Sequence, residues 1–292
     1  MKNTTNNSTA CEIYRELNGV NYVFMHSEKT ANFEKDVDIV FSILAKDPAD
    51  ITAAERFQLL RIYRPSYHKS GKIEDIMSFD STATNCAFCQ AMRKAAENNP
   101  LHICGYCYDY DQEHGFKGVN VLNRHSLNMI IMASIEFTVE ELRTLPVAYL
   151  NRVDSSGDVP NNTYACNMIK LCYAFPAVRF AFWSKNTAAV IFACDKYGKP
   201  SNVVLVQSSV IIGKPAALAK YFDVVFTVYL TKEDTAAAIA AGAGACNGKK
   251  CKDCGFKCYT GAWIADGVKN VAEYLRIPGV KDNARQDMVS VA

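Results

Sequence analysis

Two groups of cysteines constrain this chain more than any other feature of its sequence. The first follows the pattern C-x14-C-x2-C, with a tyrosine before its last member, and consists of Cys89, Cys104 and Cys107. The second follows the pattern C-x4-C-x2-C-x3-C and consists of Cys246, Cys251, Cys254 and Cys258. Thiolates at these spacings bring three or four soft ligands to one point, which suits a metal ion or an iron–sulfur cluster.

The remaining composition bears on which compartment and which partners to expect. The opening stretch from Met1 to Ser8 lacks the apolar core of a secretory signal, so we expect a cytoplasmic protein, where disulfides are rare. The 12 cysteines are therefore interpreted as ligands where they cluster, with disulfides as the less favoured alternative. Cys166 and Cys172, which lie in an apolar stretch, are interpreted as inert buried thiols. A net charge of +2 gives no general attraction to nucleic acid or to anionic membranes, and no apolar run approaches about 20 residues.

Apolar runs alternate with helical patterns along most of the chain. Helices are predicted over 30–46, 50–64, 161–175, 188–195, 214–221 and 231–241. Strands are predicted over 129–132, 149–153, 178–183, 202–207 and 224–229. Strands that are apolar on both faces and alternate with helices predict an α/β fold with a parallel sheet, either open or closed into a partial (β/α) barrel. We expect a helical cap over 1–70, an α/β core over 71–241, and a cysteine-rich knot over 242–292 that ends in a closing helix over 263–276.

Polar residues follow three of the predicted strands, at the edge where parallel strands present their carboxyl ends. These candidate site residues are Ser155, Ser156, Gly157 and Asp158, then Lys185, then Ser208 and Ser209. Two simpler interpretations stay open, because an acid such as Asp158 at a strand–helix junction is commonly a helix N-cap and a lysine is commonly solvated.

Each cysteine group also has an alternative interpretation. Cys86 precedes Cys89 by three positions, and a set of four with Cys104 and Cys107 would make a structural zinc site. In the second group, four thiolates would saturate either zinc or a cluster and act as a structural staple. The neighbouring lysines would offset thiolate charge or form a small nucleic-acid patch, and they are Lys249, Lys250, Lys252 and Lys257.

The first group resembles the motif of radical S-adenosylmethionine (radical-SAM) enzymes, which is C-x3-C-x-aromatic-C, through Cys104-Gly105-Tyr106-Cys107 and with Cys89 as an outlying ligand. The chain is also similar, over about residues 70–260, to phage-encoded gene-product-88-type proteins. The stretches that carry this similarity are 85–92, 103–108, 152–158, 180–186 and 246–259. Val159 and Ser184 depart from the family pattern, which often has an aromatic residue and a threonine there.

These resemblances imply a cysteine-rich, radical-SAM-like partial barrel without a settled activity. They imply that Cys89, Cys104 and Cys107 hold a [4Fe–4S] cluster whose open iron binds S-adenosylmethionine. The segment from Ser155 to Asp158 would then meet the methionyl amino group or the ribose, and Lys185 the carboxylate or a substrate. Ser208 and Ser209 would line the same face.

We therefore expect an iron–sulfur enzyme that cleaves S-adenosylmethionine and acts on a small molecule or a nucleotide-derived group, in the bacterial host of a phage. The alternative hypothesis is a non-enzymatic zinc- or cluster-bearing phage protein that binds nucleic acid or a host protein. No membrane partner is predicted.

Overall fold

A computed structural model describes residues 11–26, 30–115, 118–246 and 250–275. Its main element is an eight-stranded sheet that is parallel except at one edge, where β3 runs antiparallel to β4. In sheet order the strands are β3 (Ser66–Tyr67), β4 (Met77–Phe79), β5 (Leu150–Val153), β6 (Arg179–Ser184), β7 (Val203–Ser208), β8 (Val224–Tyr229), β10 (Asn270–Tyr274) and β9 (Gly244–Cys246). The predicted strands over 149–153, 178–183, 202–207 and 224–229 are confirmed, as is the mainly parallel α/β sheet. In the described residues β3 and β9 are free edges, so the sheet is open.

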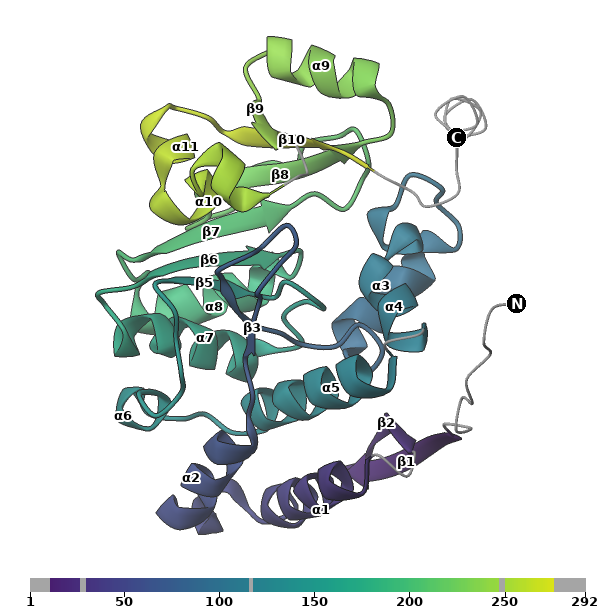
Figure 1. The fold of residues 1–292 in the computed structure, drawn as a ribbon, viewed down its shortest axis with the longest axis vertical. Helices are drawn as coiled ribbons and strands as arrows, with labels where there is room; N and C mark the ends of the chain where they lie inside the picture. The colour runs from purple at the N-terminus through teal and green to yellow at the C-terminus, as the bar shows by residue number, and fades with distance from the viewer. Residues whose placement is uncertain (1–10, 27–29, 116–117, 247–249, 276–292) are drawn as a thin grey trace.

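Helices cover one face of this sheet. Connections α7 (Asn162–Ala174) and α8 (Thr187–Tyr197) join neighbouring parallel strands and lie together on that face, with α5 (Gly118–Ser134) beside them (Figure 1). They pack against Phe180, Phe182 and Leu205 in the larger core. Because crossovers between adjacent parallel strands are right-handed, successive helices fall on the same side.

The cysteine-rich segment packs against the opposite face, which we call the knot face and define by Leu150, Ala181, Trp183 and Val206. Tyr259 in α10 (Lys257–Thr260) and Trp263 in α11 (Ala262–Ala265) form a second core with these residues. Both sheet faces are therefore buried, which explains why the strands lack a polar–apolar alternation.

The N-terminal region contains the predicted helices, as α1 (Ala31–Leu44) and α2 (Ala53–Ile62), and also a hairpin of β1 (Cys11–Leu17) and β2 (Val20–His26). Asn18 and Gly19 form the hairpin turn, with φ of 51° and 80°. An Asn-Gly pair is the strongest sequence signal for such a turn, and the sequence analysis missed it. The hairpin is attached to the core because the Asn85 side chain bonds both the N–H and the carbonyl of Val23.

The predicted strand at Met129–Met132 is wrong, because these residues lie in α5. All four side chains are buried, since α5 packs between other helices and the hairpin. A short apolar run does not distinguish a buried strand from a buried helix. The remaining connections are α6 (Val139–Leu142), which begins with a capping box formed by Thr138 and Glu141, and α9 (Lys232–Ala240).

Two of the predicted helices are also wrong. Residues 214–221 form no helix; Gly213 has a φ of +73°, Pro215 lacks an N–H, and Ser209 Oγ accepts the N–H of Ala216 instead. The predicted closing helix over 263–276 is only α11, which ends at Ala265 and is followed by a turn in which Gly267 has a φ of +72°. Strand β10 follows and inserts between β8 and β9; Arg276 lies outside the described residues.

Within the described ranges, no helix is both long and apolar enough to cross a bilayer.

A cluster of charged side chains around Glu136 provides a test of the fold. The Glu136 carboxylate lies 2.6 Å from Lys170 Nζ and 2.9 Å from Lys196 Nζ, and Tyr197 donates a hydrogen bond to it. Burial works to raise the pKa of Glu136, but these three donors lower it to about 2. Because the folded pKa lies below the unfolded value, the stabilisation is complete above that value and is lost as the pH falls toward 2.

We expect Glu136→Gln to lower the free energy of unfolding by about 1–2 kcal/mol at pH 7, after allowance for partial exposure, and by much less near pH 3. Urea unfolding at both pH values measures this, with the exposed Glu16→Gln variant as the control. An equal loss at both pH values would contradict the assignment.

Candidate functional site

The first cysteine group lies at the carboxyl edge of the sheet and comes from two short helices. Cys89 is in the first turn of α3 (Ala87–Ala96), and Cys104 and Cys107 lie in and directly after the 3₁₀ helix Ile103–Tyr106. This 3₁₀ helix is fixed to the segment that follows β7, because the Ile103 N–H donates to the Val210 carbonyl at 2.9 Å. The His102 ring accepts the N–H of Cys104, so His102 acts as an N-cap.

Lys185 is the common neighbour of the three predicted ligands. Burial works to lower the pKa of Lys185, but the Asp158 carboxylate and the thiols of Cys104, Cys89 and Cys107 raise it overall. Its ammonium lies 3.6 Å from Asp158 Oδ2, and its side chain is 24% exposed. The structure therefore brings Lys185, Asp158 and the three cysteines together, and Lys185 is not the solvated lysine of the simpler interpretation.

Cys86 is placed differently from these three. It is fully buried, whereas Cys89, Cys104 and Cys107 are partly exposed. Its sulfur accepts the N–H of Cys89 at 3.2 Å and lies 3.9 Å from the Asp158 carbonyl. Cys86 thus serves as the N-cap of α3.

Asp158 joins several parts of the site. Its carboxylate accepts hydrogen bonds from Ser184 Oγ at 2.6 Å and from the backbone N–H of Lys185 at 3.0 Å. The N-cap of α7 is Asn161, whose side chain accepts the N–H of Tyr164, so the helix-cap interpretation of Asp158 is wrong. Asp158 instead fixes the end of β6, which Lys185 directly follows.

Ser155, Ser156 and Gly157 form a turn held by the carboxylates of buried Asp80 and partly buried Asp109, neither of which was among the predicted site residues. Asp80 accepts the Ser155 hydroxyl at 2.5 Å and the N–H groups of both serines at 2.9 and 3.1 Å. Asp109 accepts the Ser156 hydroxyl at 2.9 Å and the Gly157 N–H at 3.3 Å. Both serine hydroxyls are therefore already paired, so their predicted role in cofactor binding stays a prediction.

Asp109 also has a pKa that is shifted toward neutrality. Burial raises its pKa to about 7, although Ser156, Tyr108 and Lys185 oppose the shift. A carboxyl group that titrates near neutral pH is suited to proton transfer. Its position two residues after Cys107 is the only sequence signal that points to it.

The last two predicted cofactor residues lie at the end of β7. Ser209 is buried, and its hydroxyl bonds Thr227 Oγ1 and the N–H of Ala216, both at 3.0 Å. Ser208 is partly exposed and pairs in register with Phe226 of β8. Ser209 therefore fixes the sheet edge, and Ser208 is the better placed of the two for a ligand.

The second cysteine group gathers beside the knot face. Cys251 and Cys254 lie in the 3₁₀ helix Cys251–Cys254, Cys258 lies in α10, and Cys246 ends β9. Burial raises the pKa of Cys258 to about 12, and the three other thiols of the group add to the shift. Burial likewise raises the pKa of Cys251 to about 11. The four thiols therefore lie close enough to one another to oppose each other's ionisation.

The cations nearest to this group differ from those predicted. Lys250 and Lys252 pair with Glu74, and Lys257 pairs with Asp266 at 3.3 Å; Lys249 lies outside the described residues. Arg152 and Lys72 are the cations that act to lower the pKa of Cys251. Two of these lysines share one glutamate, and the nucleic-acid patch stays a prediction.

Two observations in the described residues concern whether either cysteine group can hold a metal. No three or more of their His, Cys, Asp and Glu side chains form a ready-made group for a metal ion. The Trp263 indole N–H is buried, has no acceptor in the described part of the chain, and lies beside Cys258. A thiolate at Cys258 would supply that acceptor. The second group therefore fits a site that is loaded in the thiolate state, with proton release on binding.

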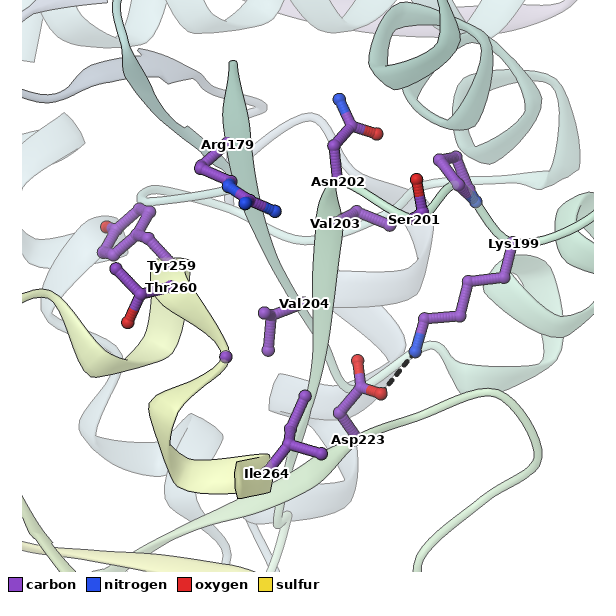
Figure 2. A pocket seen from close by; sticks show the side chains of 12 residues that line it. Arg179, Lys199, Ser201, Asn202, Val203, Val204, Asp223, Tyr259, Thr260 and Ile264 are labelled. Atoms are coloured by element: carbon purple, nitrogen blue, oxygen red, sulfur yellow. Dashed lines mark hydrogen bonds and ion pairs between the residues drawn. The ribbon is translucent and has the colours of Figure 1, made fainter. Parts of the chain in front are cut away.

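The cleft in Figure 2 lies at the opposite edge of the sheet, where β6 and β7 begin. Its volume is about 310 Å³, and it is bounded by Arg179, by residues 199–204, by Asp223 and by the segment that contains Tyr259 and Ile264. Lys199 and Asp223 form an ion pair on its wall. None of the predicted site residues lines it, so this cleft is separate from the candidate site.

Comparisons of the chain with known proteins found no relative. No family model matches the chain, and no curated protein or solved structure matches it at a significant level.

The turn at Gly157 offers a test of the site's framework. Gly157 has a φ of +74°, and a Cβ there would stand 2.3 Å from Ser81 Oγ and 2.6 Å from the Ser81 carbonyl carbon. At Gly71, which has a φ of +92°, a Cβ would meet nothing within 4 Å. Gly71→Ala therefore isolates the backbone cost, which is about 1–2 kcal/mol.

We expect Gly157→Ala to destabilise the protein by at least about 2 kcal/mol more than Gly71→Ala, because overpacking is added to the backbone cost. Thermal or urea unfolding of both variants measures the difference. Equal losses would show that Ser81 does not approach Gly157 this closely.

Proposed function

We propose that this protein is an iron–sulfur enzyme of radical-SAM-like type, with the open cluster at Cys89, Cys104 and Cys107. The observation that carries the proposal is the arrangement of these three cysteines around Lys185 and Asp158 at the carboxyl edge of a parallel sheet. Active sites of α/β folds lie at this edge. Three partly exposed thiols form a set that leaves one iron of a four-iron cluster without a protein ligand.

One contact supports a sheet that curves as a partial barrel does. Lys72, which precedes β4, forms an ion pair with Glu273 of β10, and its carbonyl accepts the N–H of Cys251 at 2.8 Å. In a flat sheet, β4 and β10 would stand five strand spacings apart, which is about 24 Å. The ion pair brings the lead-in of β4 and strand β10 together across the knot face, as a sheet that curves round the knot would.

A four-iron cluster at the first group would supply the electron for reductive cleavage of S-adenosylmethionine. The residues of this chain would set the surroundings of that reaction. Lys185 would place a positive charge beside three thiolates and offset their negative charge, and Asp158 would hold the ammonium there. Asp109, with a pKa of about 7, would hold or release a proton next to Cys107. The second group would hold a closed site that staples the knot to the sheet.

The buried position of Cys86 favours this proposal over a four-cysteine zinc site. Tetrahedral zinc requires thiolates about 3.8 Å apart, from a Zn–S bond of about 2.3 Å. Cys86 is fully buried and caps α3, whereas the other three thiols are partly exposed, although its thiol does contact that of Cys89. The non-enzymatic alternative, a zinc-bearing module that binds nucleic acid or a host protein, also depends on lysines that are paired with Glu74 and Asp266.

Metal analysis of single cysteine variants tests the ligand set. After strictly anaerobic purification, we expect Cys89→Ala, Cys104→Ala and Cys107→Ala each to lose the iron of the first group, while Cys86→Ala keeps it. Cys166→Ala, a buried thiol away from both groups, is the matched control and should keep full iron content. Loss of metal in Cys86→Ala equal to that in Cys89→Ala, with zinc as the metal, would support the structural zinc site instead.

A further inference from the structure

Between the two cysteine groups, the knot face carries an arginine whose Nε–H has no acceptor among the described residues. Arg152 follows Leu150 by two residues on β5, so its side chain points to the same face. The guanidinium carbon lies 4.2 Å from the centroid of the Trp183 ring, which fixes the plane of the group. Arg152 Nε is buried and has no acceptor among the described residues, and no carboxylate there lies within ion-pair distance of this arginine.

A second unused donor lies beside it. Tyr259 is 1% exposed, and its hydroxyl group has no hydrogen-bond acceptor in the part of the chain that the structure describes. Tyr259 packs against Trp183, with ring centroids 5.9 Å apart. Both Arg152 and Tyr259 pack on Trp183, and the guanidinium acts as a hydrogen-bond donor that opposes the rise that burial causes in the pKa of Tyr259. The Tyr259 O–H and the Arg152 Nε–H are therefore neighbouring donors, and both lack an acceptor among the described residues.

Asp80 is the carboxylate among the groups that act on Arg152; the others are Tyr259, Tyr108 and Cys251, whose raised pKa values leave them neutral at neutral pH. Arg124 Nε is also buried without an acceptor in the described residues, and His125, with both ring nitrogens unpaired there, lies 3.7 Å from Asp80. Burial lowers the pKa of His125 and of His68, so both are mainly neutral at neutral pH. Asp80, the carboxylate among these groups, is already engaged by Ser78 and by the Ser155–Ser156 turn.

We propose that Arg152, together with the Tyr259 hydroxyl, binds the anionic group of a ligand, a carboxylate or a phosphate, with Arg152 as the main recognition residue. The guanidinium presents paired N–H donors in the geometry that carboxylate and phosphate oxygens accept. An anion here would satisfy Arg152 Nε and the Tyr259 hydroxyl together. The bound anion would lie near Tyr108, which follows Cys107 of the first cysteine group, and near Cys251 of the second group. Both residues influence the ionisation of Arg152.

The assignment of this site as the substrate site of a radical-SAM-like enzyme rests on the proposed function. The assignment of the site as one that binds anions is independent of the proposed function. If the protein holds no cluster that responds to S-adenosylmethionine but still binds anions through Arg152, the enzymatic role fails and the site stands. If the cluster responds to S-adenosylmethionine and the anions do not bind, the proposed function stands and the anion site is refuted.

The test is calorimetric titration of the as-purified protein with sodium phosphate and with sodium acetate, at constant ionic strength. We expect binding in wild type, a Kd at least tenfold weaker in Arg152→Met, and an intermediate loss in Tyr259→Phe, which removes only the hydroxyl. Arg152→Lys keeps the charge but not the paired donors and should also bind more weakly. Arg143→Met, at an exposed arginine, is the matched control and should titrate as wild type does.

The two anions distinguish the sources of the group, since tighter phosphate binding indicates a phosphorylated ligand and tighter acetate binding indicates a carboxylic acid. Three results would overturn the proposal. One is the absence of binding of either anion to wild type, and another is identical titrations for the Arg152 variants and Arg143→Met. The third is a loss of metal from the second cysteine group in Arg152→Lys with unchanged anion binding, which would make Arg152 a counter-charge for thiolates.

Discussion

The candidate site depends on the ion pair between Asp158 and Lys185. Through Asp158, the turn after β5 is joined to Ser184 at the end of β6, and the Asp158 carbonyl accepts the Ser81 hydroxyl at 2.8 Å beyond the end of β4. An ion pair in such surroundings adds little net stability, because desolvation offsets its attraction. Its clearest consequence is positional: three neighbouring strand ends are held in one arrangement, and an ammonium group is held among three thiols.

A division of labour between the two cysteine groups follows from where the fold places them. The first group lies at the sheet edge, is partly exposed, and has a cation and a carboxyl group of nearly neutral pKa beside it. The second group forms part of the cover of the knot face, where Tyr259 and Trp263 pack on Trp183 and Val206. Under the proposed function, the first group would serve the chemistry and the second would serve the structure. Arg152, stacked on Trp183, lies between them with an Nε–H that has no acceptor among the described residues.

Sequence patterns were sufficient for the regular part of this fold and insufficient where tertiary contacts decide. The strands at β5 to β8 and the helices between β5 and β7 followed from apolar runs and caps, and strand-end polarity led to Asp158 and Lys185. The buried helix at Met129–Met132 and the strand β10 did not follow, because their apolar spacing fits either structure and neighbouring elements select one. Asp80 was missed because a single acid in a loop carries no periodic signal, and Asp109 because it lies in the first turn of a short helix, α4 (Tyr108–His114), where an acid is common. Only the structure shows that each closes on the Ser155–Gly157 turn.

The central claim is that Cys89, Cys104 and Cys107 hold a cluster with one iron open to S-adenosylmethionine. The most direct test is electron paramagnetic resonance of the anaerobically purified, reduced protein with and without S-adenosylmethionine. The account predicts a four-iron cluster signal that shifts when S-adenosylmethionine is added and that is lost in Cys89→Ala. An iron signal that does not shift, or stoichiometric zinc with no sulfide in protein never exposed to air, would contradict it.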